Sequence, residues 1–514
     1  GTFDGQGNTI DIELVDVMHD NAALISDLGT GAHIKNLHVT GSINTLGSAN
    51  DVASFTGTVV GYTHGKVLLE NILSTANINT SCVGDISAGG ILGYNGGQNS
   101  VLRNVIYAGE INGAEAKNCG GLIGWASTAT IIEHSASLAK MNISTDDSGN
   151  MISRNPNIVD YSGGVYVVED VFGTLHEAVQ LLSPEAVASG ELCYKLNGIT
   201  GTTFKQTLGT DEHPWPFGEH AAVYAVPTDG FRCDGAPQGD VTYSNTPSTS
   251  DVPEHTYTGG FCDVCGNIDP DHLTPNEEGY YEIANGSDLA WFSQLVNINK
   301  LTDVNAKLVA DIEMEDIDNE RFKAIGTETS PFVGHFDGQH HYIDWLNVYQ
   351  PTTRGVGLIG AVAGPAVIEN LTLEENCSIV GQGYVGLVGF STPAGGTVTF
   401  TNLGNKGLVQ CTTGANAGGL VGCCMSSACT FVITNCYSMA TILGVNENGA
   451  FSGWLGDNAV LTNCWAGTEV SGTDSGKEFC RFGSNAKFTN CWTVQGTQVN
   501  NFSADQIETG QLAW

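Results

Sequence analysis

The stretch AGGILGYNGGQNSVLRNVIY, residues 88–107, contains one copy of the pattern from which the fold class is predicted. A Gly-rich apolar segment is followed by an apolar segment centred on Asn104. The apolar Leu102 lies two residues before this asparagine, the polar Arg103 lies between them, and Val105 follows. This period-two alternation is typical of a β-strand with one face in solvent. Because both Leu102 and Val105 belong to the core, the asparagine between them is expected at a bend.

The same pair of segments recurs along both halves of the chain. The asparagine position is occupied in successive copies by Asn36, Asn71, Asn104, Asn370, Asn402, Asn435, Asn463 and Asn490, with His134 taking the place in IIEHSAS. By subtraction of these numbers the spacings are 35, 33 and 30 residues in the first half and 32, 33, 28 and 27 in the second. A repeat of this length indicates one turn of a solenoid.

Short β segments that stack on their equivalents one turn later favour a parallel β-helix over a sandwich. At about 4.8 Å per turn, asparagine side chains at a repeated bend can bond to the asparagines above and below, and asparagine tolerates the left-handed backbone that such bends use. The sequence therefore predicts an all-β chain with an asparagine ladder.

The chain contains two copies of this unit. FDGQG at residues 3–7 returns as FDGQH at 336–340, and SPEAVASGELCYKLNG from Ser183 corresponds to SADQIETGQLAW from Ser503. Ser183 and Ser503 are expected to cap short helices that close the end of a solenoid, and Ser287 is expected to cap an amphipathic helix. We expect the parent protein to be longer. The predicted domains are a first β-helix at 1–182, a helical or irregular cap at 183–219, a linker at 220–280, a helix and strands at 281–330, a second β-helix at 331–502 and the start of a helix at 503–514.

Composition excludes some partners. Of 514 residues, 55 are Asp or Glu and 18 are Lys or Arg, which gives a net charge of −37. Such a chain repels phosphate backbones and anionic membranes, so nucleic acid is not expected as a partner. The chain has no run of 18 apolar residues and hence no expected transmembrane segment.

The Gly-rich segments AGGILGY, CGGLIGW and AGGLVGC, together with FDGQG and the asparagine segments, resemble the GLUG-motif repeat family. The resemblance covers about residues 1–145 and 330–495. It implies two right-handed parallel β-helices in a secreted or surface-anchored bacterial protein, with no catalytic residues in the repeats. The phrases IANGSDLAWFSQLVN and ETGQLAW look like repeat flanks in surface proteins of gut Bacteroidota, which implies an extracellular or outer-surface location.

One candidate metal site lies in the linker. Cys262 and Cys265 form a C-x-x-C, His255 lies seven residues earlier, and Cys233 lies upstream in FRCDG. Three sulfurs and one imidazole form a closed tetrahedral set for structural Zn²⁺. Such a knot would order a segment that cannot bury a core. The alternative is a disulfide or free thiols in a flexible linker.

Other cysteines and carboxylates have simpler interpretations. Cys436, Cys464 and Cys491 occupy one place in consecutive turns, where other turns have Leu, Ile or Val, so we expect small core residues. HEAVQ from His176 lacks the second histidine of a zinc protease and is expected on a surface helix. The loop pair Asp146 and Asp147 is expected to be solvated or to form a weak Ca²⁺ site.

The favoured function is a non-catalytic surface or secreted scaffold that serves adhesion or binds glycans or host proteins. Four tryptophans are candidates for stacking on sugars: Trp125, Trp454, Trp465 and Trp492. The alternative is a carbohydrate-active β-helix enzyme, a polysaccharide lyase or glycoside hydrolase, which would need carboxylates clustered in a cleft. Self-association through Ca²⁺ is a third hypothesis that rests on the net charge alone.

Overall fold

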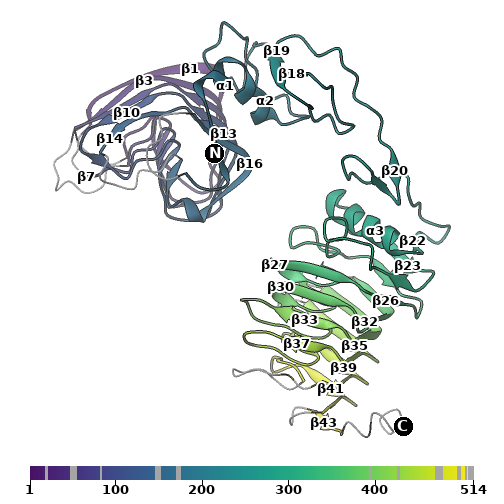
Figure 1. Ribbon diagram of the computed structural model, residues 1–514. Coiled ribbons are helices and arrows are strands. Elements are labelled where there is room, and N and C mark those ends of the chain that lie inside the picture. Colours follow the sequence, from purple (N-terminus) through teal and green to yellow (C-terminus); the bar gives the residue numbers. More distant parts are fainter. Residues whose placement is uncertain are drawn as a thin grey trace. The chain divides into compact units, whose positions relative to one another are not determined.

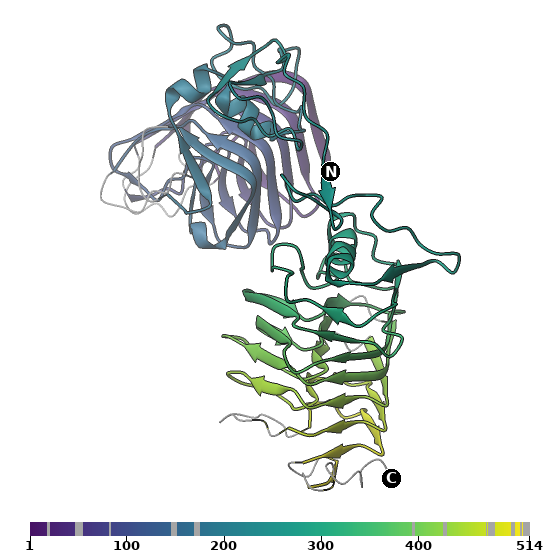
Figure 2. The same ribbon diagram turned by 45° about the vertical axis from the view of Figure 1, so that its right-hand side comes forward.

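The computed structural model describes residues 1–17, 21–46, 55–81, 84–144, 152–168, 175–392, 396–424, 429–468, 470, 479–494, 499–503 and 506. The chain divides into two compact units, Gly1–Glu254 and His255–Trp514. Each contains a parallel β-helix (Figures 1 and 2), which confirms the all-β class expected from the repeats. The finer domain boundaries within these units stay predictions.

The first unit is built on two large parallel sheets. One follows the order β14-β10-β6-β3-β5-β9-β13-β16-β17, with β1 also paired to β3, and the other follows β15-β12-β8-β4-β2. The strands are β1 (Thr2–Val17), β2 (Ile25–Leu28), β3 (His33–Thr45), β4 (Val60–Thr63), β5 (Leu68–Ser74), β6 (Asn77–Thr80), β7 (Gly84–Asp85), β8 (Leu92–Asn95), β9 (Ser100–Tyr107), β10 (Glu110–Gly113), β11 (Ala116–Lys117), β12 (Ile123–Ala126), β13 (Thr130–Ser137), β14 (Lys140–Ile143), β15 (Ser153–Arg154), β16 (Val159–Val168), β17 (Val179–Leu182), β18 (Tyr224–Pro227) and β19 (Val241–Ser244). A 3₁₀ helix, Pro156–Ile158, and two α-helices, α1 (Pro184–Ala188) and α2 (Glu191–Asn197), complete the unit.

The second unit has three parallel sheets, and its layers are seen most plainly in Figure 2. The largest runs from β22 to β43, and the others follow β27-β30-β33-β37 and β28-β31-β34-β38. The elements are β20 (Tyr257–Thr258), β21 (Phe261–Cys262), β22 (Tyr280–Ile283), α3 (Gly286–Ile298), β23 (Asn305–Leu308), β24 (Ile312–Glu313), β25 (His335–Asp337), β26 (Tyr342–Asp344), β27 (Asn347–Val356), β28 (Ile359–Val362), β29 (Val367–Leu373), β30 (Ser378–Val385), β31 (Val388–Ser391), β32 (Gly396–Asn405), β33 (Leu408–Cys411), β34 (Val421–Cys424), β35 (Cys429–Thr434), β36 (Tyr437–Ser438), β37 (Thr441–Leu443), β38 (Ser452–Trp454), β39 (Val460–Thr462), β40 (Trp465–Ala466), β41 (Lys487–Thr489), β42 (Trp492–Thr493) and β43 (Asn500–Asn501).

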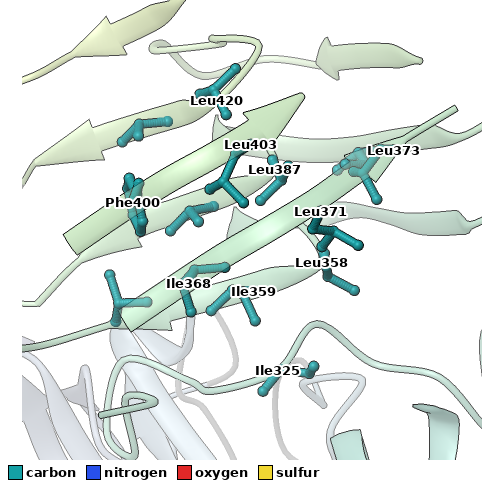
Figure 3. Packing of buried hydrophobic residues seen from close by; sticks show 14 of the residues in the cluster. Ile325, Leu358, Ile359, Ile368, Leu371, Leu373, Leu387, Phe400, Leu403 and Leu420 are labelled. Atoms are coloured by element: carbon teal, nitrogen blue, oxygen red, sulfur yellow. The ribbon is translucent and has the colours of Figure 1, made fainter. Parts of the chain in front are cut away.

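The strand register places equivalent residues of successive turns directly against one another. In the second unit, Ile368 pairs with Phe400, and Phe400 pairs with Ile433. All three are fully buried, as the alternation predicts. Figure 3 shows this interior, where Ile368 and Leu371 of β29 lie among apolar side chains from the neighbouring turns. Each β-helix therefore has its own continuous core, made of stacked layers of similar side chains.

The asparagine ladder is present in both units. Every asparagine of the repeated position has a positive φ, between 51° and 57°. In the first unit, Asn104 donates to Asn71 at 2.9 Å and Asn71 donates to Asn36 at 3.0 Å. In the second, the chain of amide bonds runs from Asn490 through Asn463, Asn435 and Asn402 to Asn370, with N···O distances of 2.8, 3.0, 3.2 and 2.7 Å. The left-handed bend aims each side chain along the solenoid axis, so each turn bonds to the one before it.

The first unit has a second asparagine ladder, which was not predicted from the sequence. Asn142 donates to Asn112 at 2.7 Å, Asn112 to Asn79 at 3.0 Å, and Asn79 to Asn44 at 2.9 Å. The spacing of these asparagines could have predicted the ladder, because they lie 35, 33 and 30 residues apart, as do the residues of the first ladder position. The match between the two sets shows that both ladders follow the same turns.

Glycines form a tight corner where the Gly-rich segments pass from turn to turn. Gly57 bridges to Gly89, and Gly89 to Gly120. A Cβ atom on any of the three would lie only 2.1–2.2 Å from the carbonyl oxygen three residues ahead. No side chain fits at that distance, which explains why the segments repeat glycine here. The three cysteines expected in the core, Cys436, Cys464 and Cys491, are all buried.

The helices differ from expectation in their positions. α1 starts at Pro184 after Ser183, as predicted, but the Ser183 side chain makes no capping bond. Leu192 and Leu196 of α2 belong to one core cluster with Leu73 and Ile106, which are register partners on successive strands. The helix pair therefore covers the side of the first β-helix instead of closing its end, because apolar side chains on that outer face need cover.

Two further local expectations were wrong. α3 is capped by Asn285, which accepts from the N–H of Asp288 at 3.0 Å, and not by Ser287, which lies within the helix. The residues from His176 form a turn that leads into β17, not a surface helix. The helix expected from Ser503 lies almost wholly outside the described residues. Within the described part of the chain, no helix combines the length and apolar character needed to cross a bilayer.

Candidate functional site

The first candidate site is a thiol and imidazole cluster at the start of the second unit. β20 and β21 pair as a small antiparallel hairpin, and Cys262 ends it. The N–H of Gly266 donates to the Cys262 carbonyl at 2.9 Å, which closes the turn that carries Cys265. His255 Nδ1 lies 3.4 Å from Cys265 Sγ, and the ligand atoms of His255, Cys262 and Cys265 all lie within 4.8 Å of one another.

This donor set fits zinc. Cys262 and Cys265 are thiols and are not joined in a disulfide. Two sulfurs and one imidazole supply three of the four ligands of a structural Zn²⁺ site. Cys233 belongs to the other unit, where it is buried in a turn closed by the bond from Arg232 N to Ala236 O at 2.8 Å. Its place as the fourth ligand stays the prediction made from the sequence.

Three of the four tryptophans expected to bind sugars have a ring face engaged by another side chain. In the first unit, Tyr62 and Tyr94 stack at 4.7 Å, and Trp125 meets Tyr94 edge-on at 5.3 Å. The guanidinium of Arg154 lies 4.1 Å over the Trp125 ring. Arg154 therefore occupies a face of Trp125, and the stacking of Tyr62 on Tyr94 occupies a face of each tyrosine, so these faces are not open to a sugar.

Of the three tryptophans expected to bind sugars in the second unit, Trp454 and Trp465 have a ring face engaged, and Trp492 uses its indole N–H in a bond within the chain. Arg481 lies 5.2 Å over the ring of Trp454. Trp465 stacks on Tyr437 at 5.1 Å. Trp492, the register partner of Trp465, donates its indole N–H to Asn490 Oδ1 at 2.9 Å. These rings strengthen contacts between turns, so they are weak candidates for a ligand platform.

A different aromatic pair is open to solvent. Trp345 and Tyr349 are 45% and 58% exposed, whereas Leu346 and Val348 between them are fully buried. The alternation DWLNVYQ at residues 344–350 could have identified this outward face from the sequence. Trp345 lies just before β27 and Tyr349 lies within it, and both side chains face solvent.

A pocket of about 410 Å³ adjoins this aromatic pair. Its lining consists of Met314, Glu315, Asp316, Ile317, Asp318, Asn319, Trp345 and Asn347. Asn319 Oδ1 accepts from the backbone N–H of Tyr349 at 2.8 Å, which ties the acidic loop to β27. The pocket thus combines an exposed indole with carboxylate and amide groups that can bond to hydroxyls. Asp146 and Asp147, the carboxylates considered from the sequence, lie outside the described residues.

The architecture defines the class of protein as a parallel β-solenoid with two units. No known family model matches the chain. A stretch of 173 residues is 30% identical to Halomucin of Haloquadratum walsbyi and covers 32% of this chain, but the chain spans only 2% of the length of that relative. The chain is also similar to a solved structure described as "a putative immunoglobulin A1 protease" from Bacteroides ovatus, with 17% identity, a TM-score of 0.34, and coverage of 47% of this chain and 89% of that one.

Proposed function

We propose that this chain is a rigid adhesive module of a secreted or outer-surface bacterial protein, that it belongs to the GLUG-repeat family, and that it binds neutral glycans. The repeated Gly-rich and asparagine segments support the family. The ladders support the rigidity, since they bond each turn to the next along both units. The similarity to part of Halomucin supports the location.

The pair of exposed aromatics beside the acidic pocket is the observation that carries glycan binding. A sugar ring covers the indole of Trp345 with its C–H face, and its hydroxyls donate to the carboxylates of Asp316 and Asp318. Tyr349 extends the platform along the strand. The carboxylates repel sulfated and uronic sugars, as does the net charge of −37, so the ligand is a neutral oligosaccharide.

A glycan array, followed by calorimetry on the full chain, tests this assignment. Trp345→Ala should weaken binding of a neutral oligosaccharide by about tenfold or more, because the platform supplies on the order of 1–2 kcal/mol. The matched control is Trp465→Ala, which removes a ring that already stacks on Tyr437. Equal affinity of Trp345→Ala and the unmodified chain would overturn the proposal.

The carboxylates that line the same pocket allow a test of the glycan-binding proposal against the enzyme alternative. Glu315, Asp316 and Asp318 are the described carboxylates that line it, and a glycoside hydrolase needs two such groups at the scissile bond. Incubation with neutral polysaccharides should release no reducing ends under the binding hypothesis. Product release that is lost in Asp316→Asn would establish the enzyme alternative instead.

We also propose that Cys233, His255, Cys262 and Cys265 hold a structural Zn²⁺ ion. The support is the closeness of the last three in the second unit and the tetrahedral preference of zinc for sulfur and imidazole. When bound, the ion supplies folding energy to a segment that lacks an apolar core of its own. The His255 ring stacks on Tyr257, with the ring centroids 5.4 Å apart, and this contact holds the imidazole in its orientation.

A further inference from the structure

A second group of potential metal ligands lies on the outer face of the second β-helix. His335 and Asp337 are two residues apart on β25, so their side chains point to the same side of the sheet. Glu369 of β29 is the register partner of Asp337. One ligand atom from each of the three lies within 4.8 Å of the other two. The three residues, which we call the β25/β29 triad, therefore converge although they span 35 residues of sequence.

Neighbouring groups orient the histidine of the triad. The Tyr280 hydroxyl lies 2.6 Å from His335 Nδ1, and His335 Nε2 lies 2.8 Å from Glu369 Oε1. The backbone N–H of His335 also donates to Asn305 Oδ1 at 2.9 Å. With Nδ1 held by the tyrosine oxygen, Nε2 is the nitrogen that faces the carboxylates. Metal-binding histidines have the same arrangement, in which an outer partner fixes the second ring nitrogen.

Hydrogen bonds also fix the carboxylate of Asp337. Its Oδ1 accepts from the backbone N–H of Gln339 at 2.9 Å and from Asn370 Nδ2 at 3.0 Å, and its Oδ2 accepts from the Gln339 side chain. Each carboxylate oxygen has two lone pairs, so these bonds leave acceptor sites free. Hydrogen bonds thus hold the triad in place but leave a lone pair of Asp337 Oδ2 available to a metal ion.

The charges along this face differ between the two units. In the first unit, Arg103 separates Glu70 from Glu133 and bonds to both, at 3.3 and 2.7 Å. In the second unit, Asp337 and Glu369 are direct neighbours, with no cation between them. Like charges that lie opposite each other on adjacent strands are destabilising.

The flanks of the acidic pair do not supply that missing charge. Lys307 is the register partner of Asp337 on the other side, but its Nζ is engaged by Glu278 at 3.4 Å and Glu282 at 3.2 Å. The register partner of Glu369 in the next turn is Thr401, which is neutral. A bound cation at the triad would balance the acidic pair as Arg103 does in the first unit.

We propose that His335, Asp337 and Glu369 bind one divalent transition cation. An imidazole nitrogen with two carboxylates suits Mn²⁺ or Zn²⁺ better than a purely oxygen-liganded ion such as Ca²⁺. In the ion-free chain, His335 Nε2 lies within hydrogen-bond distance of Glu369 Oε1. A bound ion would take the place of this hydrogen bond, and the neutral imidazole would keep its one N–H at Nδ1, which faces the Tyr280 hydroxyl.

Manganese is the probe that separates this site from the cysteine cluster, because it prefers oxygen ligands to thiolates. The full chain is first loaded with one equivalent of zinc and then titrated with Mn²⁺, with free Mn²⁺ followed by electron paramagnetic resonance. We expect one Mn²⁺ site, which Glu369→Gln and His335→Ala each weaken by about tenfold or more.

The matched control is the double variant His33→Ala and Glu70→Gln. These residues form a similar hydrogen-bonded pair at 3.2 Å, but with Arg103 as the neighbour of the carboxylate. It should leave the Mn²⁺ affinity unchanged. Circular dichroism and thermal melting establish that each variant is folded. The absence of a discrete Mn²⁺ site, or the same affinity in Glu369→Gln and the unmodified chain, would overturn the proposal whatever the outcome of the glycan experiments.

Discussion

The side-chain amide of Asn370 donates to Asp337 Oδ1 at 3.0 Å, and Asn36 makes the same bond, also at 3.0 Å, to Asp4 in the other unit. A carboxylate accepts hydrogen bonds but cannot donate them, so it can end an asparagine ladder and cannot continue one. The repeated phrase FDGQ therefore marks the first rung of the ladder in each copy. The aspartate also accepts from the backbone N–H of the following glutamine, Gln6 or Gln339.

Removing a central rung should destabilise the second β-helix. Asn402→Ala loses the bonds to Asn370 and Asn435 and places alanine at φ 55°. The expected loss is about 2–4 kcal/mol, from the two hydrogen bonds and the left-handed backbone. Hydrogen exchange of β29 and β32 measures it. Asn402→Gly, which keeps the backbone but not the bonds, should lose less. Equal losses in both variants would show that only the hydrogen bonds matter.

Acid should weaken the second β-helix partly through Asp337. Burial by itself raises the pKa of this carboxyl, but the hydrogen bonds from Asn370 and Gln339 outweigh burial and hold the pKa below its usual value. The folded state thus favours the charged form. Its contribution is complete above the unfolded pKa of about 3.9 and is lost as the pH falls through the lower folded value.

Asp337→Asn tests this expectation, since an amide does not titrate. The difference in melting temperature between the unmodified chain and the variant should narrow between pH 6 and pH 3. Parallel pH curves for the two proteins would contradict it. Because the variant also removes a ligand of the proposed β25/β29 triad, the measurement is made in the presence of a chelator.

The tight glycine corner should not tolerate a methyl group. Gly89→Ala would place a Cβ atom 2.2 Å from the carbonyl oxygen of Leu92, so the backbone of the turn must move. We expect a loss of about 3 kcal/mol or more, in the range of severe steric substitutions. Gly29→Ala in the same unit is the control, since its Cβ would meet nothing within 4 Å. Similar melting temperatures for both variants would rule out the steric argument.

Zinc removal should affect the hairpin and not the solenoids. By elemental analysis, we expect His255→Ala and Cys265→Ser each to hold one zinc fewer per chain than the unmodified protein, and Cys233→Ser as well if this residue is the fourth ligand. Cys464→Ala, a fully buried core thiol, should keep full occupancy. A chelator should speed hydrogen exchange in β20 and β21 of the unmodified chain but not of Cys265→Ser. A purified chain without stoichiometric zinc would end the hypothesis.

The solenoid could be predicted because its signals are local. Asn104 bends the chain by its own tolerance of positive φ, and Leu102 faces inward through strand alternation alone. The C-x-x-C of Cys262 and Cys265 was visible for the same reason, since both ligands lie on one turn. The alternation DWLNVYQ also indicates the exposed face of Trp345, but this stretch lies outside the Gly-rich and asparagine segments, so the repeat pattern does not point to it.

The period of the turns, the inward face of each strand and the residue at each bend could all be predicted from the amino-acid sequence, because they follow from properties of single residues and their near neighbours. The folded chain was needed to see which rings stack, which carboxylates become neighbours and where the helices pack. The first two kinds of contact join residues about one turn apart, as with His335 and Glu369, and the helices pack on strands still further away in sequence. The strand register that brings such residues together is set by the packing of the whole core.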